Sequence, residues 1–244
     1  MGRIFSILAL FAILHYGQAV ATDAKPMPIT ATSWLVADED GQIIQGKNTE
    51  QQRSIASITK LMTAMVVLDA HQDLDEFIKP YSRLELIQLA IVKSDNRASE
   101  LLCDSYPGGR DSCIRAMNVK ARQLGLTKTR YIDPTGLSIM NISTAEELIK
   151  IVLESAKYPE IVEASNLSQV KIKLKKKFLV FNNTNPIIGK RHDFVVSKTG
   201  YIRASGGCIV MMLNTDVGRR IIVVLGSKNT HTRIPEAEFI AKSF

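Results

Sequence analysis

One tetrapeptide places a hydroxyl close to an amine at the start of a predicted apolar helix. Ser57 and Lys60 lie three residues apart in the sequence Ser-Ile-Thr-Lys. Residues i and i+3 share a face of a helix, so the Lys60 amine can reach the Ser57 hydroxyl. Free backbone N–H groups at a helix start favour developing negative charge. A lysine serves as the base for a serine when burial or a neighbouring cation keeps it neutral. The pair therefore indicates nucleophilic catalysis by a serine.

Two further motifs strengthen this interpretation. Ser94-Asp95-Asn96 follows an apolar run, and Lys198-Thr199-Gly200 ends a predicted strand. Ser-x-x-Lys alone is a weak signal, because roughly one copy is expected by chance in such a chain. A second copy, Ser168 to Lys171, lies in a polar, lysine-rich stretch and is interpreted as accidental. The three motifs in this order are the set used by penicillin-binding proteins and serine β-lactamases.

Metal and histidine chemistry have no comparable support. Beyond residues 1–21 the chain has three histidines, His71, His192 and His231, and none lies at zinc-ligand spacing from a Cys, a Glu or another His. The sequence contains no His-Glu-x-x-His motif, no Gly-x-Ser-x-Gly elbow and no P-loop. A Ser-His-Asp triad can be dispersed in sequence, but it has no local support here. We therefore expect no metal site.

The predicted elements distribute these motifs over one fold. Apolar residues at helical spacing predict a helix at 57–70, and helices are also predicted at 83–92 and 95–103. Strands are predicted at 33–37, 43–45, 195–199, 207–213 and 220–226. Further helices are predicted at 112–124 and 234–242, and another is predicted to begin at a capping box formed by Ser143 and Glu146. This order predicts an α/β (α+β) fold: an antiparallel sheet from both chain ends, flanked by helices, with a helical region inserted.

Longer segments make the resemblance more specific. Residues 56–65 resemble the active-site helix of the low-molecular-weight penicillin-binding proteins. The segments at 106–109, 116–118, 133–138 and 183–185 resemble the D-alanyl-D-alanine endopeptidases of the penicillin-binding protein 7 group. The resemblance implies a β-lactamase/transpeptidase-like fold and a periplasmic enzyme that cleaves peptidoglycan peptides. It also implies covalent inhibition by β-lactams and no cofactor.

The resemblance also assigns roles to the first two motifs. Ser57 is similar to the nucleophile that becomes acylated, and Lys60 is similar to its general base. Ser94 is expected to relay a proton to the leaving amine, and Asn96 to hold the peptide carbonyl of the substrate. The implied reaction is transfer of a D-Ala acyl group to the serine and then to water.

The third motif is expected to complete the substrate site. Lys198 would add positive charge that favours neutral Lys60, and Thr199 and Gly200 would contact the carboxylate-bearing end of the substrate. The backbone N–H groups of the nucleophilic serine and of Tyr201 would form the oxyanion hole.

Several alternatives stay open at the level of sequence. Carboxypeptidase and endopeptidase activities both cleave after a D-Ala, and the motifs do not separate them. A β-lactamase shares the motifs, but no Glu-x-x-Leu-Asn box for rapid deacylation is present. A non-catalytic penicillin- or peptidoglycan-binding module is the third possibility. The segment between the first two motifs is shorter around residues 73–86 than the resemblance leads us to expect, which puts the adjacent wall of the substrate site in doubt.

The N-terminus has the pattern of a secretory signal peptide. Arg3 precedes an apolar run at 4–14, and small residues end at Ala21. We expect cleavage there, which leaves residues 22–244 as a single catalytic domain in the periplasm. An uncleaved N-terminal anchor is the alternative, but the run is short for a membrane span. No other stretch approaches a span, and 234–242 is too short for a convincing membrane helix, so we expect no stable membrane anchor.

Cysteine usage is consistent with export. Cys103 and Cys113 flank a nine-residue loop with Pro-Gly-Gly at its centre, which makes a disulfide plausible in an oxidising compartment. Two buried free thiols are the alternative, because a sequence does not give the Cα separation. Cys208 lies in an apolar run, where core packing is the expected role.

The positive charge is concentrated in one stretch. The composition is that of a globular protein with a net charge of +7, which becomes +6 without residues 1–21. Five lysines fall within 171–177, so the rest of the chain is close to neutral and gives no case for nucleic acid. One interpretation of the stretch is an edge strand whose lysines prevent unwanted pairing. A site for anionic polymers is the other.

Overall fold

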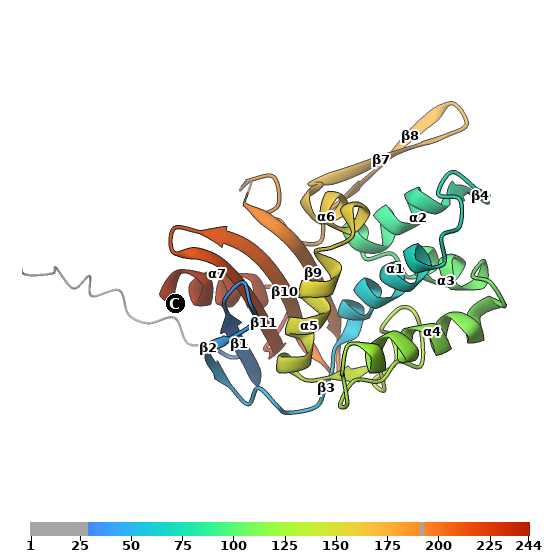
Figure 1. Ribbon diagram of the computed structural model, residues 1–244. Coiled ribbons are helices and arrows are strands. Elements are labelled where there is room, and N and C mark those ends of the chain that lie inside the picture. The colour runs from blue at the N-terminus through green and yellow to red at the C-terminus, as the bar shows by residue number, and fades with distance from the viewer. Residues whose placement is uncertain (1–28, 191–192) are drawn as a thin grey trace, which may run out of the picture.

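A five-stranded antiparallel sheet forms the centre of the protein (Figure 1). The computed structural model describes residues 29–190 and 193–244, so the expected signal peptide (1–21) and His192 lie outside the described residues. The strand order is β2-β1-β11-β10-β9. Their bounds are β1 Ser33–Ala37, β2 Ile43–Lys47, β9 Phe194–Ile202, β10 Gly206–Thr215 and β11 Gly218–Ser227.

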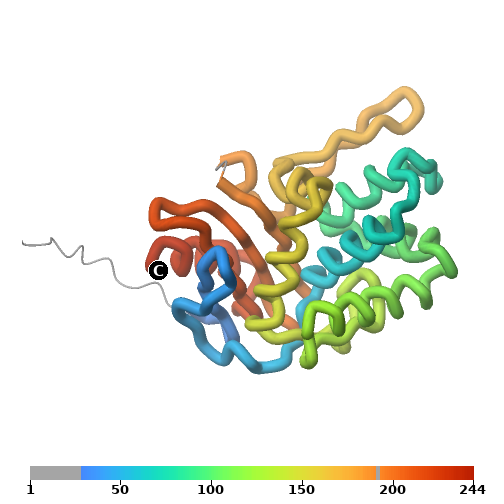
Figure 2. Tube along the Cα trace, viewed as in Figure 1, coloured from blue at the N-terminus to red at the C-terminus, as the bar shows by residue number. Residues whose placement is uncertain are grey.

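The two ends of the chain meet in this sheet. β1 pairs with β11 in a register that places Trp34 opposite Val224. In Figure 2 the blue N-terminal strands lie beside the red C-terminal ones. The long β10 and β11 are buried along most of their length, because helices cover both faces of the sheet. The predicted sheet from both chain ends is confirmed.

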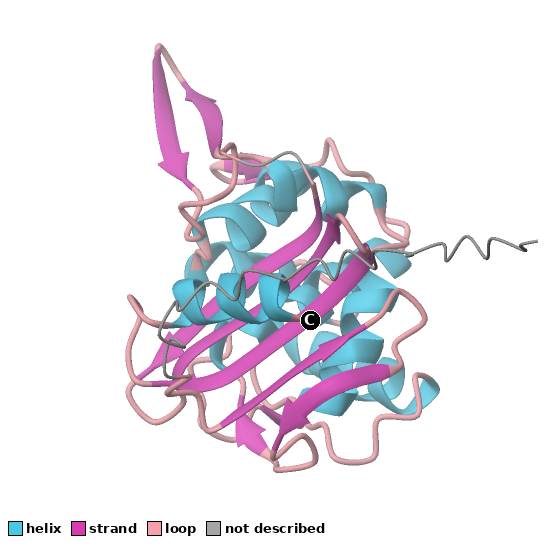
Figure 3. Ribbon diagram, turned by 90° about the vertical axis from the view of Figure 1, so that its left-hand side faces the viewer, coloured by secondary structure: helices cyan, strands magenta, loops and turns pink. Residues whose placement is uncertain are grey.

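Helices form a layer on each side of the sheet. The C-terminal helix α7 packs on β10 and β11 over one face (Figure 3), and α5 and α6 pack on the other. The helical bounds are η1 Ala56–Ile58, α1 Thr59–Asp69, α2 Arg83–Gln88, η2 Leu89–Lys93, α3 Asn96–Asp104, α4 Gly109–Gln123, α5 Ala145–Ser155, α6 Pro159–Asn166 and α7 Arg233–Ser243. Separate apolar cores fill the spaces on the two sides.

Among residues 29–190 and 193–244, three pairs of strands lie outside the main sheet. β3 (Arg53–Ser54) pairs with β6 (Ile142–Ser143), and β4 (Phe77–Ile78) pairs with β5 (Tyr81–Ser82). β7 (Gln169–Leu174) and β8 (Lys177–Asn182) form a hairpin that extends beyond the body of the protein (Figures 1 and 3). The lysine-rich pattern predicts one strand over 171–177, whereas a tight turn at 175–176 divides these residues between β7 and β8.

Two local predictions need correction. The expected capping box at Ser143 is wrong: Thr144 is the N-cap of α5, and its side chain accepts from the Glu147 N–H. Ser143 belongs to β6, where pairing with Arg53 fixes it in extended conformation. The helix predicted at 83–92 consists of two parts: the α-helix α2 and the π-helix η2 that follows it.

A disulfide joins the adjacent helices α3 and α4. Cys103 and Cys113 are bonded, with their Cα atoms 5.3 Å apart. Cys208 is buried in β10 with a free thiol. None of the helices in the described parts of the chain has the length and apolar content needed to cross a membrane.

Candidate functional site

Ser57 lies in a tight turn that leads into the buried helix α1. Ala56, the residue before it, has a φ of 46°, and η1 continues directly into α1 at Thr59. The Ser57 side chain is half-buried, whereas Lys60 in the first turn of α1 is completely buried. The helix is held in place because its side chains are buried over nine of its eleven residues.

The Lys60 amine lies among three oxygen atoms. Its Nζ is 3.0 Å from Ser57 Oγ, 2.8 Å from Asn96 Oδ1 and 2.6 Å from the backbone oxygen of Thr135. The amide and backbone oxygens can only accept hydrogen bonds, so they take two protons of the amine. When the amine is neutral, its lone pair is left for the Ser57 hydroxyl. This is the geometry that a general base needs.

Burial prepares Lys60 for this role. It lowers the pKa of Lys60 to about 7, although the negative charges of Asp133, Asp95 and Glu100 act in the opposite direction. The charged form loses its hydration in the protein interior, which favours the neutral amine. A substantial fraction of Lys60 is therefore neutral near pH 7.

Lys198 on β9 is the second buried amine of the site. Its Nζ donates to Ser94 Oγ at 2.8 Å and to the Thr199 backbone oxygen at 2.9 Å. Burial lowers the pKa of Lys198 well below its ordinary value, and the positive charges of Lys60 and Arg233 lower it further. The resemblance implied that the charge on Lys198 keeps Lys60 neutral. In the structure, burial of Lys60 is the main cause.

The second motif occupies the break between two helices. Ser94 ends η2 with a φ of 58°, in the left-handed region, and this turns its hydroxyl toward Lys198. Asp95 is the N-cap of α3, and its side chain accepts from the Ala98 N–H at 2.8 Å. Asn96 is then the first residue of α3, close enough to hold Lys60. The motif thus contacts both buried amines: Ser94 accepts from Lys198, and Asn96 accepts from Lys60.

Gly200 allows the edge strand β9 to approach the serine. A Cβ added to Gly200 would lie 2.9 Å from the Ser57 backbone nitrogen, closer than real Cβ atoms come. Thr199 is buried and its Oγ1 lies 2.7 Å from Thr184 Oγ1. Tyr201 is 46% exposed at the mouth of the site.

The loop at residues 131–141 forms another wall of the site. The Asp133 carboxylate accepts from the backbone N–H groups of Thr135 and Gly136, both at 2.7 Å, and this directs the Thr135 carbonyl to Lys60. These hydrogen bonds hold the pKa of Asp133 below its ordinary value, against the effect of burial. Gly136 has a φ of 82°, and a Cβ there would lie 1.9 Å from the Ala56 oxygen.

Buried Asn141 fastens this loop to α1. Its Nδ2 donates to the Asp133 backbone oxygen at 2.8 Å and to Thr59 Oγ1 at 3.2 Å. Thr63 Oγ1 also donates to the Pro134 backbone oxygen at 2.8 Å. In the sequence, residues 133–138 carry only the family resemblance, and nothing in them signals that a backbone carbonyl faces the lysine.

All three motifs open into one cleft of about 240 Å³. Ser57, Ser94, Asn96, Thr199, Gly200 and Tyr201 line it, together with Leu137, Thr184, Thr230 and Arg233. Leu137 and Thr184 lie in segments that carry the family resemblance, whereas no motif marks Thr230 or Arg233. Arg233 is 7% exposed, and its Nη1 donates to the Gly200 backbone oxygen at 2.7 Å. It begins α7, so the C-terminal helix contributes a cation to the cleft. The second Ser-x-x-Lys copy runs from Ser168, just before β7, into that strand, and it does not line this cleft.

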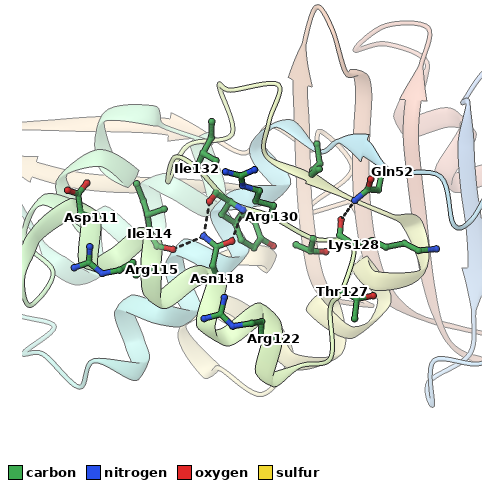
Figure 4. Close-up of a pocket in the computed structure, with 13 residues that line it drawn as sticks. Gln52, Asp111, Ile114, Arg115, Asn118, Arg122, Thr127, Lys128, Arg130 and Ile132 are labelled. Carbon is green, nitrogen blue, oxygen red and sulfur yellow. Dashed lines mark hydrogen bonds between the residues drawn. The ribbon is translucent and has the colours of Figure 1, made fainter.

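A larger hollow of about 780 Å³ shares no lining residue with this cleft (Figure 4). We call it the α4 groove. Arg115 and Arg122 of α4 and Lys128 and Arg130 of the following loop line it, with one acid, Asp111. None of the three motifs reaches it, so we assign the candidate active site to the smaller cleft. Among the described residues, no group of three or more His, Cys, Asp or Glu side chains could hold a metal ion.

Solved structures with the same fold define the class of protein. Penicillin-binding protein D2 from Listeria monocytogenes, in an ampicillin-bound form, matches with a TM-score of 0.79 and 23% identity, over 88% of this chain and 97% of that chain. The Streptomyces K15 DD-transpeptidase matches with a TM-score of 0.81 and 22% identity, over 90% of this chain and 98% of that chain. The fold is therefore that of penicillin-binding proteins and DD-transpeptidases.

Sequence similarity specifies the family. The family model of peptidase family S11, D-alanyl-D-alanine carboxypeptidase, matches residues 19–78 and 75–229. A D-alanyl-D-alanine endopeptidase from Pseudomonas aeruginosa is 33% identical over 266 aligned positions, 96% of this chain and 86% of the relative. A D-alanyl-D-alanine endopeptidase from Escherichia coli is 34% identical over 263 aligned positions, which cover 96% of this chain and 85% of the relative. The chain belongs to peptidase family S11 and is a serine-type hydrolase. The family match is divided at 75–78, within the segment expected to be short.

Proposed function

We propose that the protein hydrolyses D-alanyl peptide bonds of peptidoglycan through an acyl-enzyme on Ser57. The observation that carries this proposal is the 3.0 Å approach of Lys60 Nζ to Ser57 Oγ, with the pKa of Lys60 lowered to about 7. A serine hydroxyl is a weak nucleophile until a base accepts its proton. The buried, partly neutral amine supplies that base.

The proposed reaction has two stages. Ser57 Oγ attacks the carbonyl carbon of D-Ala while Lys60 accepts the hydroxyl proton. The N–H groups of Ser57 and Tyr201 stabilise the oxyanion. The tetrahedral intermediate then expels the amine, which receives a proton from Ser94, a hydroxyl hydrogen-bonded to Lys198. Ser94 is reprotonated by the Lys60 ammonium, which becomes neutral again. In the second stage water attacks the ester carbonyl and gives a proton to Lys60, and that proton returns to Ser57 Oγ as the acyl group leaves as a carboxylic acid.

The remaining cleft residues position the substrate in this proposal. Asn96 lies beside Lys60, where its amide can hold the peptide carbonyl. Thr199 and Gly200 line the side of the cleft that also contains Arg233. A buried arginine attracts carboxylates strongly, so the carboxylate-bearing end of the substrate is expected there.

We further propose that the preferred substrate is a D-Ala cross-link between two peptides, which makes the enzyme an endopeptidase. Three relatives at 33–34% identity are named D-alanyl-D-alanine endopeptidase, and those named carboxypeptidase are 25–29% identical. Incubation with monomeric pentapeptide and with cross-linked dimeric muropeptides, followed by mass analysis, tests the preference. Monomers released from the dimer are expected. Release of free D-Ala alone would show a carboxypeptidase.

β-Lactams are expected to acylate Ser57 and to be released slowly. None of the residues lining the cleft is an Asp or a Glu, so it holds no carboxylate to activate water as in class A β-lactamases. An adduct that persists for many minutes after excess penicillin is removed is expected. Release within seconds would make the protein a β-lactamase, and failure to label at all would favour a non-catalytic module.

Residues 22–244 are proposed to act as one exported catalytic domain in the periplasm. The support is the signal-peptide pattern at 1–21 and the position of motifs at 57, 94 and 198 around one cleft. The N-terminal sequence of the protein recovered from the periplasm tests this proposal. A start at Thr22 is expected, whereas an intact Met1 would show an uncleaved anchor.

A further inference from the structure

The β7–β8 hairpin has two chemically different faces. Its register pairs Val170 with Phe181 and Ile172 with Leu179, and both strands contact η2. We call this the inner face, although Leu179 near the tip is 38% exposed. Val170 and Ile172 are buried and form part of the main core. The inner face therefore fixes the hairpin to the body and sets the direction in which it extends.

The outer face alternates cations with apolar side chains. Lys173 pairs with Phe178, and Lys171 pairs with Val180, across the two strands. Phe178 is 67% exposed and Val180 is 51% exposed. Burial of such apolar side chains is normally favourable, so their exposure calls for an explanation.

The hairpin is also strongly cationic. Its five lysines at 171, 173, 175, 176 and 177 are all exposed, and the hairpin contains no acidic residue. Within the described residues, none of these lysines forms an ion pair, although seven other ion pairs are present. Their charge is thus available to a partner.

We propose that this outer face docks on the surface of an anionic lipid bilayer. A cationic surface attracts anionic headgroups by about 1 kcal/mol per lysine near the membrane. Aromatic and aliphatic side chains between the cations can enter the boundary between headgroups and acyl chains. The docking is peripheral and reversible, since it rests on one hairpin rather than on a membrane-spanning helix.

The apolar residues favour a bilayer over an anionic polymer. A polysaccharide neutralises lysines but offers no apolar layer to receive Phe178 and Val180. Lysines that only protected a strand edge would have no need of an exposed Phe between them. A bilayer surface satisfies both kinds of side chain on the same face.

Docking would also set the position of the active site. Asn183 donates to the Ser168 and Leu167 backbone oxygens across the base of the hairpin, at 2.8 and 2.9 Å. The next residue, Thr184, lines the cleft and is hydrogen-bonded to Thr199. The docking face is thus joined directly to the rim of the cleft. This inference goes beyond the proposed function and does not depend on it.

Sedimentation of the mature chain with lipid vesicles tests the inference. Vesicles of phosphatidylglycerol mixed with phosphatidylcholine are compared with vesicles of phosphatidylcholine alone. The variant Lys173→Gln/Lys175→Gln/Lys176→Gln is expected to bind the anionic vesicles about 100-fold more weakly, because 1 kcal/mol per lysine is about fivefold in affinity. Salt screens the attraction between lysines and headgroups but not the insertion of apolar side chains. The variant Phe178→Ser/Val180→Thr is therefore expected to lose the binding to anionic vesicles that the wild type retains at high salt.

The α4 groove supplies a matched control. Arg115→Gln/Arg122→Gln/Arg130→Gln removes the same charge at another surface and is expected to bind as the wild type does. The inference is overturned if the wild type ignores anionic vesicles, or if the control loses as much affinity as the lysine variant. It is also overturned if the lysines are needed only for binding to isolated peptidoglycan sacculi. Circular dichroism and the urea unfolding midpoint of each variant confirm that it is folded.

Discussion

The protonation state of the Lys60 side chain determines whether Ser57 can act as the nucleophile. The pKa of Lys60 is lowered to about 7, and only the neutral amine accepts a proton from Ser57. Below pH 7 the amine becomes charged, so the rate of acylation is expected to fall about tenfold per pH unit. Above pH 7 the rate is expected to level off. Labelling rates with a fluorescent penicillin from about pH 5 to about pH 9 measure this. A rate that does not change below pH 7 would contradict the assignment.

Short motifs name most of the residues that the structure brings together in the candidate site, because their residue types are rare in combination. Ser57, Asn96 and Lys198 come from three separate parts of the chain and lie around one cleft or directly beside it. Arg233 and the Thr135 carbonyl were not predicted. An arginine at the start of an amphipathic helix is common, and a backbone carbonyl has no signature in the sequence.

At the scale of the element, the approach of the 133–141 loop to the serine turn is the most demanding contact. Gly136→Ala is expected to slow penicillin labelling strongly and to destabilise the protein, because the new Cβ would lie 1.9 Å from the Ala56 oxygen. Gly109→Ala is the control: its φ of 74° is similar, but a Cβ there meets nothing within 4 Å. The control is expected to cost only about 1–2 kcal/mol, from the backbone conformation. Equal effects of the two substitutions on labelling would show that the contact is unimportant.

The disulfide between α3 and α4 is expected to stabilise the fold without taking part in catalysis. Replacing both Cys103 and Cys113 by Ala is expected to lower the free energy of unfolding by about 2–3 kcal/mol, as estimated for closure of a short loop. Urea denaturation measures the change, and penicillin labelling at low urea is expected to be retained. An unchanged unfolding midpoint would show that the bond contributes nothing to stability.

Some elements were predictable and others were not, for physical reasons. The long buried strands and α1 have clear apolar patterns, so their positions agree with the sequence analysis. The helix α6 (Pro159–Asn166) is short and was not predicted. In β8 all residues but one are exposed, so its sequence lacks the alternation of a half-buried strand.

At the scale of the whole molecule, the sheet separates two apolar cores that both must form. Ile240 of α7 is completely buried in the smaller core. Ile240→Ala is expected to lower the free energy of unfolding by about 2–4 kcal/mol. Ile44→Ala, at a side chain that is 44% exposed on β2, is expected to cost much less. Similar costs for the two substitutions, measured by urea denaturation, would contradict a close-packed core beneath α7.

The most direct test of the account is to locate the acyl group. After incubation with penicillin, mass analysis of the intact protein and of its peptides is expected to find one adduct, on the peptide that contains Ser57. Ser57→Ala is expected to carry none, and Lys60→Ala is expected to label far more slowly while remaining folded. An adduct on another residue, or full labelling of Ser57→Ala, would contradict the account.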